Sequence, residues 1–258
     1  MAIVSPVYPG TPLQVGSYGS PVARVQTYLN ALNTQYPSLP KLVVDGKFGN
    51  NTKTAVQIYQ AVKGLQVDGI VGQNTWNTLI GEYNDRFGGS ADTYPGIPLK
   101  NGMTGEDVTH MQTYLNALAK VYTAINTLTV DGKFGTNTQN AVQRFQKQFG
   151  LTADGEIGQN TWNKIVSAYN AVQAGNPLPV VTPYPGTPVQ QGSSGDSVRF
   201  VQSYLNAADG AGLVIDGQFG SKTKTAVVAF QAQNGLKPDG IVGSATWAAL
   251  RTAFNATL

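Results

Sequence analysis

The sequence predicts an all-α protein built from three tandem small three-helix-bundle modules with glycine-rich loops. The pattern [VI]-D-G-[KQ]-F-G occurs three times in the 258 residues, and each copy precedes a second Asp-Gly pair and then a tryptophan. Apolar residues recur at helical spacing between these landmarks. The two aspartates are 23 residues apart in every copy, which indicates a repeated folding unit: Asp45 and Asp68, Asp131 and Asp154, Asp216 and Asp239.

Copies of this unit fill nearly the whole chain. Each is close to the lower size limit for burying a core without help from disulfides or metals. The predicted modules span residues 8–83, 94–172 and 184–257.

Two short segments are the predicted linkers, at residues 84–93 and 173–182. Pro177 and Pro179 lie in the second segment and Pro183 follows it, and prolines stiffen a linker. We therefore expect modules with limited freedom rather than a flexible string.

The first helix of each module follows a Gly/Pro/Ser-rich loop that begins YPG. In the first module Ser20 is the predicted N-cap and Pro21 the first helical residue. The segment QTYLNAL occurs in the first two modules and reads QSYLNAA in the third. One apolar stripe lies at helical spacing along this helix: Val22, Val25, Leu29 and Leu32.

The second helix follows the first Asp-Gly loop, and the third helix follows the second loop. Gly64 is a predicted C-terminal stop for the second helix, and the third helix carries Trp76. The third module lacks five residues between its first helix and its Asp-Gly loop, where a surface connection tolerates deletion. The predicted apolar face of the second helix comprises Ala55, Val56, Tyr59 and Val62.

Composition excludes several classes of protein. Residues are 41% hydrophobic and 12% charged, and no apolar run approaches the roughly 20 residues of a membrane span. Without cysteine there are no disulfides or thiolate zinc sites. The +3 net charge comes from scattered basic residues, which argues against nucleic acid as a partner. Residues 1–6 contain no recognisable signal peptide.

Catalytic constellations are also missing from the sequence. The only histidine, His110, is expected on an exposed helix face, and one histidine cannot build a metal triad or a Ser-His-Asp set. Glycan cleavage needs two positioned carboxylates, but Glu82 and Glu156 have no acidic partners recurring across the copies. We expect no enzymatic activity, no cofactor and no metal.

The repeated polar and aromatic residues have structural and functional interpretations. The Asp-Gly pairs suit tight turns. They do not suit calcium, because Lys47 and Phe48 occupy positions that a calcium-binding loop would give to oxygen ligands. The aromatic rings of Phe48 and Trp76 suit packing in the core. Tyr28 falls on the border of the buried stripe, where its ring could pack or, with a solvated hydroxyl, stack on a sugar. Gln26 could bond loop backbone or an acetamido group.

The combined pattern resembles the type 1 peptidoglycan-binding domain of bacterial cell-wall hydrolases. It reads G-S-x-G-x-x-V-x-x-x-Q-x-x-L, then D-G-x-F-G-x-x-T-x-x-A-V-x-x-[FY]-Q, then D-G-x-x-G-x-x-T-W. Residues 16–29, 45–60 and 68–76 supply it in the first module, and the second departs from it at the serine. The resemblance covers nearly the whole chain and implies a three-helix fold and non-catalytic attachment to the bacterial cell wall.

The candidate ligand-binding residues combine the border tyrosines, the recurring glutamines, the first Asp of each module and the second-helix aromatics. They are Gln26, Tyr28, Asp45, Tyr59 and Gln60 in the first module; Gln112, Tyr114, Asp131, Phe145 and Gln146 in the second; and Gln202, Tyr204, Asp216, Phe230 and Gln231 in the third.

These observations predict multivalent binding to peptidoglycan, through its glycan or its stem peptide. The chain would act as a monomer at the cell wall or outside the cell, or be delivered by a spore or phage. It would be a stand-alone attachment protein or the targeting part of a hydrolase of the zinc amidase or peptidase type. The alternative is a structural or protein-interaction component of a spore layer or phage particle.

Overall fold

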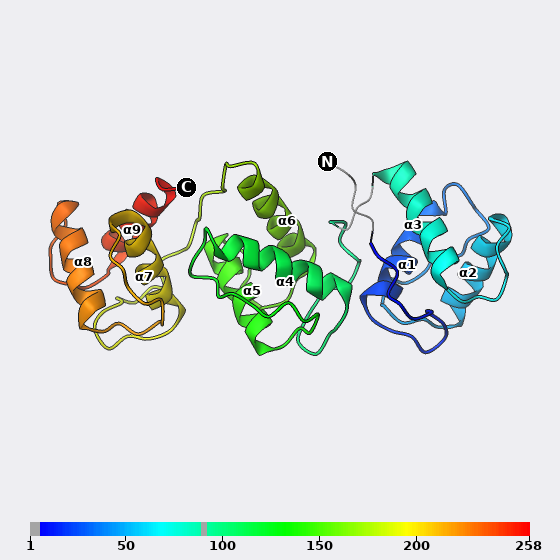
Figure 1. Ribbon diagram of the computed structural model, residues 1–258, viewed down its shortest axis with the longest axis horizontal. Coiled ribbons are helices and arrows are strands. Elements are labelled where there is room, and N and C mark those ends of the chain that lie inside the picture. Colours follow the sequence, from blue (N-terminus) through cyan, green and yellow to red (C-terminus); the bar gives the residue numbers. More distant parts are fainter. Residues whose placement is uncertain (1–5, 89–91) are drawn as a thin grey trace. The chain divides into compact units, whose positions relative to one another are not determined.

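The computed structural model describes residues 6–88 and 92–258 (Figure 1). Two segments lie outside this part: residues 89–91 of the first expected linker, and residues 1–5, which belong to the segment in which no signal peptide was recognised. The described residues contain nine α-helices and isolated β-bridges but no strand, which confirms the all-α prediction. The helices are α1 Ser20–Leu32, α2 Asn50–Val62, α3 Gln73–Phe87, α4 Glu106–Ala119, α5 Thr136–Gln148, α6 Gln159–Gln173, α7 Asp196–Asp209, α8 Ser221–Gln233 and α9 Ser244–Asn255.

The chain groups into two compact units. The first takes in residues up to Thr113 together with Val130–Thr136 and Glu156–Asn163. The second takes in Tyr114–Thr129, Asn137–Gly155 and Lys164–Leu258.

In the first unit, α1 packs against both α2 and α3. The core between them contains the predicted stripe of α1, and Phe48 and Trp76 are each 2% exposed, so their predicted packing role is confirmed. The predicted apolar face of α2 is buried except at Val62, which is 46% exposed. Val62 is the last residue of α2 and is not part of the hydrophobic core.

The start of α1 differs from the prediction by one residue. Ser20 is the first helical residue, and the N-cap is Gly19 at φ 107°, without a side-chain cap bond. The Gly19 N–H donates to the carbonyl of Gly46 at 2.8 Å, so the first Asp-Gly loop fixes this residue in a conformation that favours glycine. The predicted stop at Gly64 is confirmed, because Gly64 at φ 65° follows the end of α2 and the Leu65 N–H donates to the Gln60 carbonyl.

In the second unit, α7 packs against α8 and α9. The α9 side chains Trp247 and Leu250 are buried, as is Phe230 of α8. The connection between α7 and the following Asp-Gly loop is the one that is five residues shorter than in the other modules. Asn206 holds this shortened connection by hydrogen bonds to both backbone groups of Leu213.

The segment after α6 is an ordered strap within the second unit. The Tyr122 hydroxyl donates to the Leu178 carbonyl at 2.8 Å, and the Val181 N–H donates to the Gln148 carbonyl at 2.8 Å. Asn255 bonds both backbone groups of Val180, at 2.8 and 2.9 Å. Hydrogen bonds on both sides therefore hold the segment that the prolines were expected to stiffen. The first predicted linker begins inside α3, which continues to Phe87.

Candidate ligand-binding site

A buried glutamine holds the first Asp-Gly turn of the first module. Gln26 of α1 is 2% exposed, and its Nε2 donates to Asp45 Oδ1 at 2.9 Å and to the Lys47 carbonyl at 3.0 Å. Its Oε1 accepts the Gly46 N–H at 2.9 Å. Asp45 Oδ1 also accepts the Lys47 N–H at 2.9 Å, so the turn is closed from within and tied to α1.

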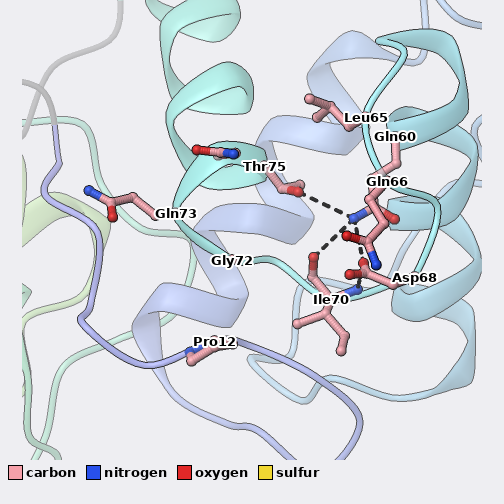
Figure 2. Close-up of a pocket in the computed structure, with 10 residues that line it drawn as sticks. Pro12, Gln60, Leu65, Gln66, Asp68, Ile70, Gly72, Gln73 and Thr75 are labelled. Atoms are coloured by element: carbon pink, nitrogen blue, oxygen red, sulfur yellow. Dashed lines mark hydrogen bonds between the residues drawn. The ribbon is translucent and has the colours of Figure 1, made fainter.

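The same arrangement occurs a second time in this module. Gln60 of α2 donates to Asp68 Oδ1 at 2.8 Å, to the Ile70 carbonyl at 3.0 Å and to Thr75 Oγ1 at 3.2 Å (Figure 2). Its Oε1 accepts the Gly69 N–H at 2.8 Å. We call the set of buried Gln, Asp-Gly turn and helix-start Thr a turn unit. In each, Thr follows Asp by seven positions, and Thr52 completes the first.

Turn units recur in the other two modules. In each of these four units the Gln Nε2 donates to the Asp Oδ1, at 2.7 to 3.1 Å, and the Gln Oε1 accepts the glycine N–H. The deletion in the third module shortens the separation between Gln and Asp from 19 to 14 residues without altering the bonds. The four glutamine–aspartate pairs are Gln112 with Asp131, Gln146 with Asp154, Gln202 with Asp216, and Gln231 with Asp239.

The first Asp-Gly turn of each module favours the ionised form of its carboxylate. The Gln26 side-chain amide and the Lys47 N–H hold the pKa of Asp45 below its ordinary value, and Gln202 and the Gln218 N–H do the same for Asp216. The pKa of Asp131 is lowered first by the Lys133 N–H and then by Gln112. These aspartates are exposed, so each module presents a negative charge at a rigid surface turn.

The three tyrosines expected at the border of the buried stripe of each first helix differ from one another in their surroundings. Tyr28 is fully buried, its ring stacks on Tyr83 of α3 with centroids 3.7 Å apart, and its hydroxyl accepts a hydrogen bond from Arg24 at 3.0 Å. Of the two interpretations of Tyr28, packing and stacking on a sugar, the structure favours packing, because α3 covers the ring. Tyr204 is 1% exposed and bonds Thr182 at 2.6 Å. Tyr114 is half-buried and has hydrogen-bond or ring contacts of its own.

The aromatic candidates of the second helix lie in the core. Tyr59 is 1% exposed and Phe145 and Phe230 are equally enclosed. The Tyr59 hydroxyl donates to Glu82 at 3.0 Å, and the Tyr36 hydroxyl donates to the same carboxylate at 2.6 Å. Burial opposes ionisation of Glu82, but bonds from Tyr36, Tyr59 and Lys63 outweigh it and lower its pKa. A ligand could reach these aromatic rings only if the core opened.

Two open hollows adjoin the turn units of the first module. One, of about 430 Å³, is lined by Asp45, Val43 and Asn51 among others. The second, of about 410 Å³, is lined by Asp68, Pro12 and Leu65 among others (Figure 2). Asp45 is one of the candidate residues predicted from the sequence, whereas Asp68, which lines the second hollow, is not, although Asp precedes Thr by seven positions in both loops.

His110, the only histidine, is half-buried rather than exposed. Its Nε2 lies 3.0 Å from Asp92 Oδ1 and its ring stacks on Trp162. Within residues 6–88 and 92–258 there is no group of three or more His, Cys, Asp or Glu side chains placed to hold a metal ion. The same residues include no helix that is long and apolar enough to cross a membrane.

The fold and the turn units define a class of repeated three-helix modules with rigid, polar surface turns. A family model described as "Putative peptidoglycan binding domain" matches residues 18–79, 104–165 and 194–250. The chain therefore belongs to this family, and it contains three tandem copies of the domain, as the sequence pattern predicted.

Similar proteins include amidases and a carboxypeptidase from bacteria. A "Probable N-acetylmuramoyl-L-alanine amidase" of Bacillus licheniformis is 39% identical over 150 residues, which are 55% of this chain and 41% of the amidase. The amidase CwlL of the same species is 37% identical over 159 residues, covering 55% and 42%. A zinc D-Ala-D-Ala carboxypeptidase of Streptomyces albus G is 49% identical over 61 residues, covering 23% and 24%. The chain thus spans less than half the length of each.

Proposed function

We propose that this protein binds bacterial peptidoglycan without cleaving it, through several sites at once. The observation that supports this most strongly is the threefold match to a peptidoglycan-binding domain, with the turn units present in all three modules. The protein would act as a stand-alone wall-attachment protein or as the targeting part of a hydrolase.

Repetition supports multivalent attachment. Once one module has bound a polymeric wall, the next faces an effective concentration on the order of millimolar, so avidity exceeds single-site affinity by about a hundredfold or more. The strap at residues 176–184 limits the freedom of the third module within its unit, which reduces the entropy lost on the second binding event.

The contacts of the ionisable residues support a non-catalytic role. Glu82 is engaged by two tyrosine hydroxyls and Lys63, and Asp45 and Asp68 each close a turn. A carboxylate that acts as a general acid or nucleophile must instead be positioned against a scissile bond with a second carboxylate.

Co-sedimentation with purified, insoluble peptidoglycan tests the proposal. We expect the full chain to pellet with the wall at moderate salt and to release no soluble wall fragments on prolonged incubation. Chitin-free cellulose serves as the matched insoluble control. Protein that stays in the supernatant would refute wall binding, and a stable complex with another protein combined with indifference to the wall would support the structural alternative. Release of fragments would refute the non-catalytic role.

A further inference from the structure

The end of α5 is covered in the second module, whereas the other modules leave the corresponding place open. The last residue of this helix, Gln148, is 0% exposed, but Val62 at the end of α2 is 46% exposed and Gln233 at the end of α8 is also exposed. The three helices have the same length and the same place in the repeat. The covering segment is the strap that leads into the third module, whose Val181 N–H donates to the Gln148 carbonyl at 2.8 Å.

No free residue separates the two modules at this junction. The bond from Val181 ties the strap to α5 of the second module. The carbonyl of the next residue, Thr182, accepts hydrogen bonds from Trp247 Nε1 at 3.0 Å and from Arg251 at 3.2 Å, both on α9 of the third module. Two adjacent residues are therefore held by different modules, and the connection has no slack over which the modules could separate.

Side-chain contacts join the two modules beside this connection. Asp196, the first residue of α7, lies 2.7 Å from Arg144 Nε and 2.7 Å from Lys147 Nζ, both on α5. The side chains of Arg144 and Asp196 are only 12% and 23% exposed, and shielding from water strengthens such a pair. The hydroxyls of Thr123 and Ser203 lie 2.7 Å apart.

The charged residues of this junction depart from the repeat. Apolar residues stand in the other modules where α5 has Arg144 and Lys147: Ile58 and Ala61 in α2, and Ala229 and Ala232 in α8. The first turn of α1 has no acidic residue in the place of Asp196. The first and third modules form the same second helix without the two basic residues, so the fold of a single module does not require them.

The junction within the first unit shares these features. The Asp92 carbonyl accepts a hydrogen bond from Trp162 of the second module, and the carbonyl of the next residue, Thr93, accepts one from Arg24 of α1 at 3.1 Å. Arg24 also donates to Asp107 in the first turn of α4. In both places, adjacent residues are held by different modules, and an acid at the start of the following module pairs with a base of the preceding one.

We propose that the end of α5 is a docking surface for the third module, and that the second and third modules fold as one cooperative body. The acidic start of α7 matches the basic residues of α5, so the charge pair also fixes which module follows the second. The coupling does not depend on peptidoglycan binding, and its test does not use the wall.

Fluorine NMR of the full chain labelled with 5-fluorotryptophan tests the coupling, because each module contains one of the three tryptophans. The variants W76F, W162F and W247F assign the three resonances. Each resonance then reports the unfolding of its own module as urea is added. For the unaltered chain, we expect the folded-state resonances of Trp162 and Trp247 to disappear at the same urea concentration.

A variant altered only in the second module shows whether the third depends on it. Y122F/T123A/R144I/K147A removes the side-chain contacts to the strap and to α7. We expect the unfolding midpoint reported by Trp247 to fall by about 1 M urea, although the third module is unchanged. The control K120A/S167A alters exposed or solvent-facing positions of the second module and should leave that midpoint in place.

The reciprocal variant D196S/S203A alters only the third module and should lower the midpoint reported by Trp162. If the four changes in the second module prevent folding, as circular dichroism would show, R144I/K147A applies the same test while leaving the hydroxyl contacts intact. Widely separated Trp162 and Trp247 midpoints in the unaltered chain would overturn the inference. So would variants that each lower only the midpoint of the module they alter, because the modules would then fold independently.

Discussion

The six buried glutamines are the residues on which the loops depend. Each uses both ends of its amide, because Nε2 donates to the Asp carboxylate while Oε1 accepts from the glycine next to it. A buried amide is tolerated when its hydrogen bonds are made. These side chains therefore stabilise the turns, and both ends of each amide are engaged in internal hydrogen bonds.

Replacing Gln60 should unfold the second turn before the rest of the module. In Q60L the Gly69 N–H and the Ile70 carbonyl lose their partner, which we expect to cost about 1–3 kcal/mol in the free energy of unfolding. Urea denaturation measures this cost. The matched control is Q66L, since Gln66 is exposed on the same loop and its loss should change stability little. Equal effects of the two substitutions would contradict a structural role for the amide.

The role of a single residue could be predicted from the sequence where that role depends on the residue itself and its neighbours along the chain. The Asp-Gly turns were predicted from the needs of the backbone, and Phe48 and Trp76 from their size. The surroundings of Tyr28 were not, because its position around α1 says nothing about Tyr83, which lies on α3 and covers the ring. Whether the tyrosine and glutamine candidates contact a ligand remains a prediction, but burial favours the packing interpretation for Tyr28, Tyr204 and Tyr59.

At the scale of the element, glycine starts the helices of the first module. The N-caps of α1, α2 and α3 are Gly19, Gly49 and Gly72, and none makes a side-chain cap bond. The sequence suggested Ser20 for α1 because serine is the better intrinsic cap. The tertiary bond from Gly19 to Gly46 outweighs that preference.

A pair of glycine substitutions tests this dependence on backbone conformation. Gly46 lies at φ 68°, and an added Cβ would be 3.0 Å from the Gly19 carbonyl oxygen. We expect G46A to cost about 1–2 kcal/mol from the left-handed conformation alone. The control G49A should cost less, because Gly49 lies at φ −95° with open space around its Cβ position. Chemical denaturation of both variants makes the comparison, and an equal loss would refute the argument.

At the scale of the whole molecule, buried polar contacts join segments far apart in sequence. Within the first unit, Arg24 of α1 donates to Asp107 of α4 at 2.5 Å and to the Thr93 carbonyl at 3.1 Å. The side chains of Arg24 and Asp107 are 2% and 11% exposed. The first unit thus includes the start of the second module.

Breaking this ion pair should be far more costly than breaking a surface pair. R24M leaves Asp107 buried without its partner, and we expect a loss of about 3–5 kcal/mol. The double variant R24M/D107L should recover part of it, since no buried charge remains. R86M, which removes the 41% exposed partner of Glu82, is the control and should cost about 1 kcal/mol or less. Additive single and double effects in urea unfolding would show that the two residues are not coupled.

Local sequence patterns are enough to predict the three all-α modules, the family to which they belong and the Asp-Gly turns. These follow from helical periodicity and from the backbone preferences of Gly and Asp, which act over a few residues. Which polar side chains form internal hydrogen bonds and which face an open hollow could be learned only from the folded chain. That depends on contacts such as Gln26 with Asp45 and Gln60 with Asp68, where a side chain of one helix meets a loop elsewhere in the chain.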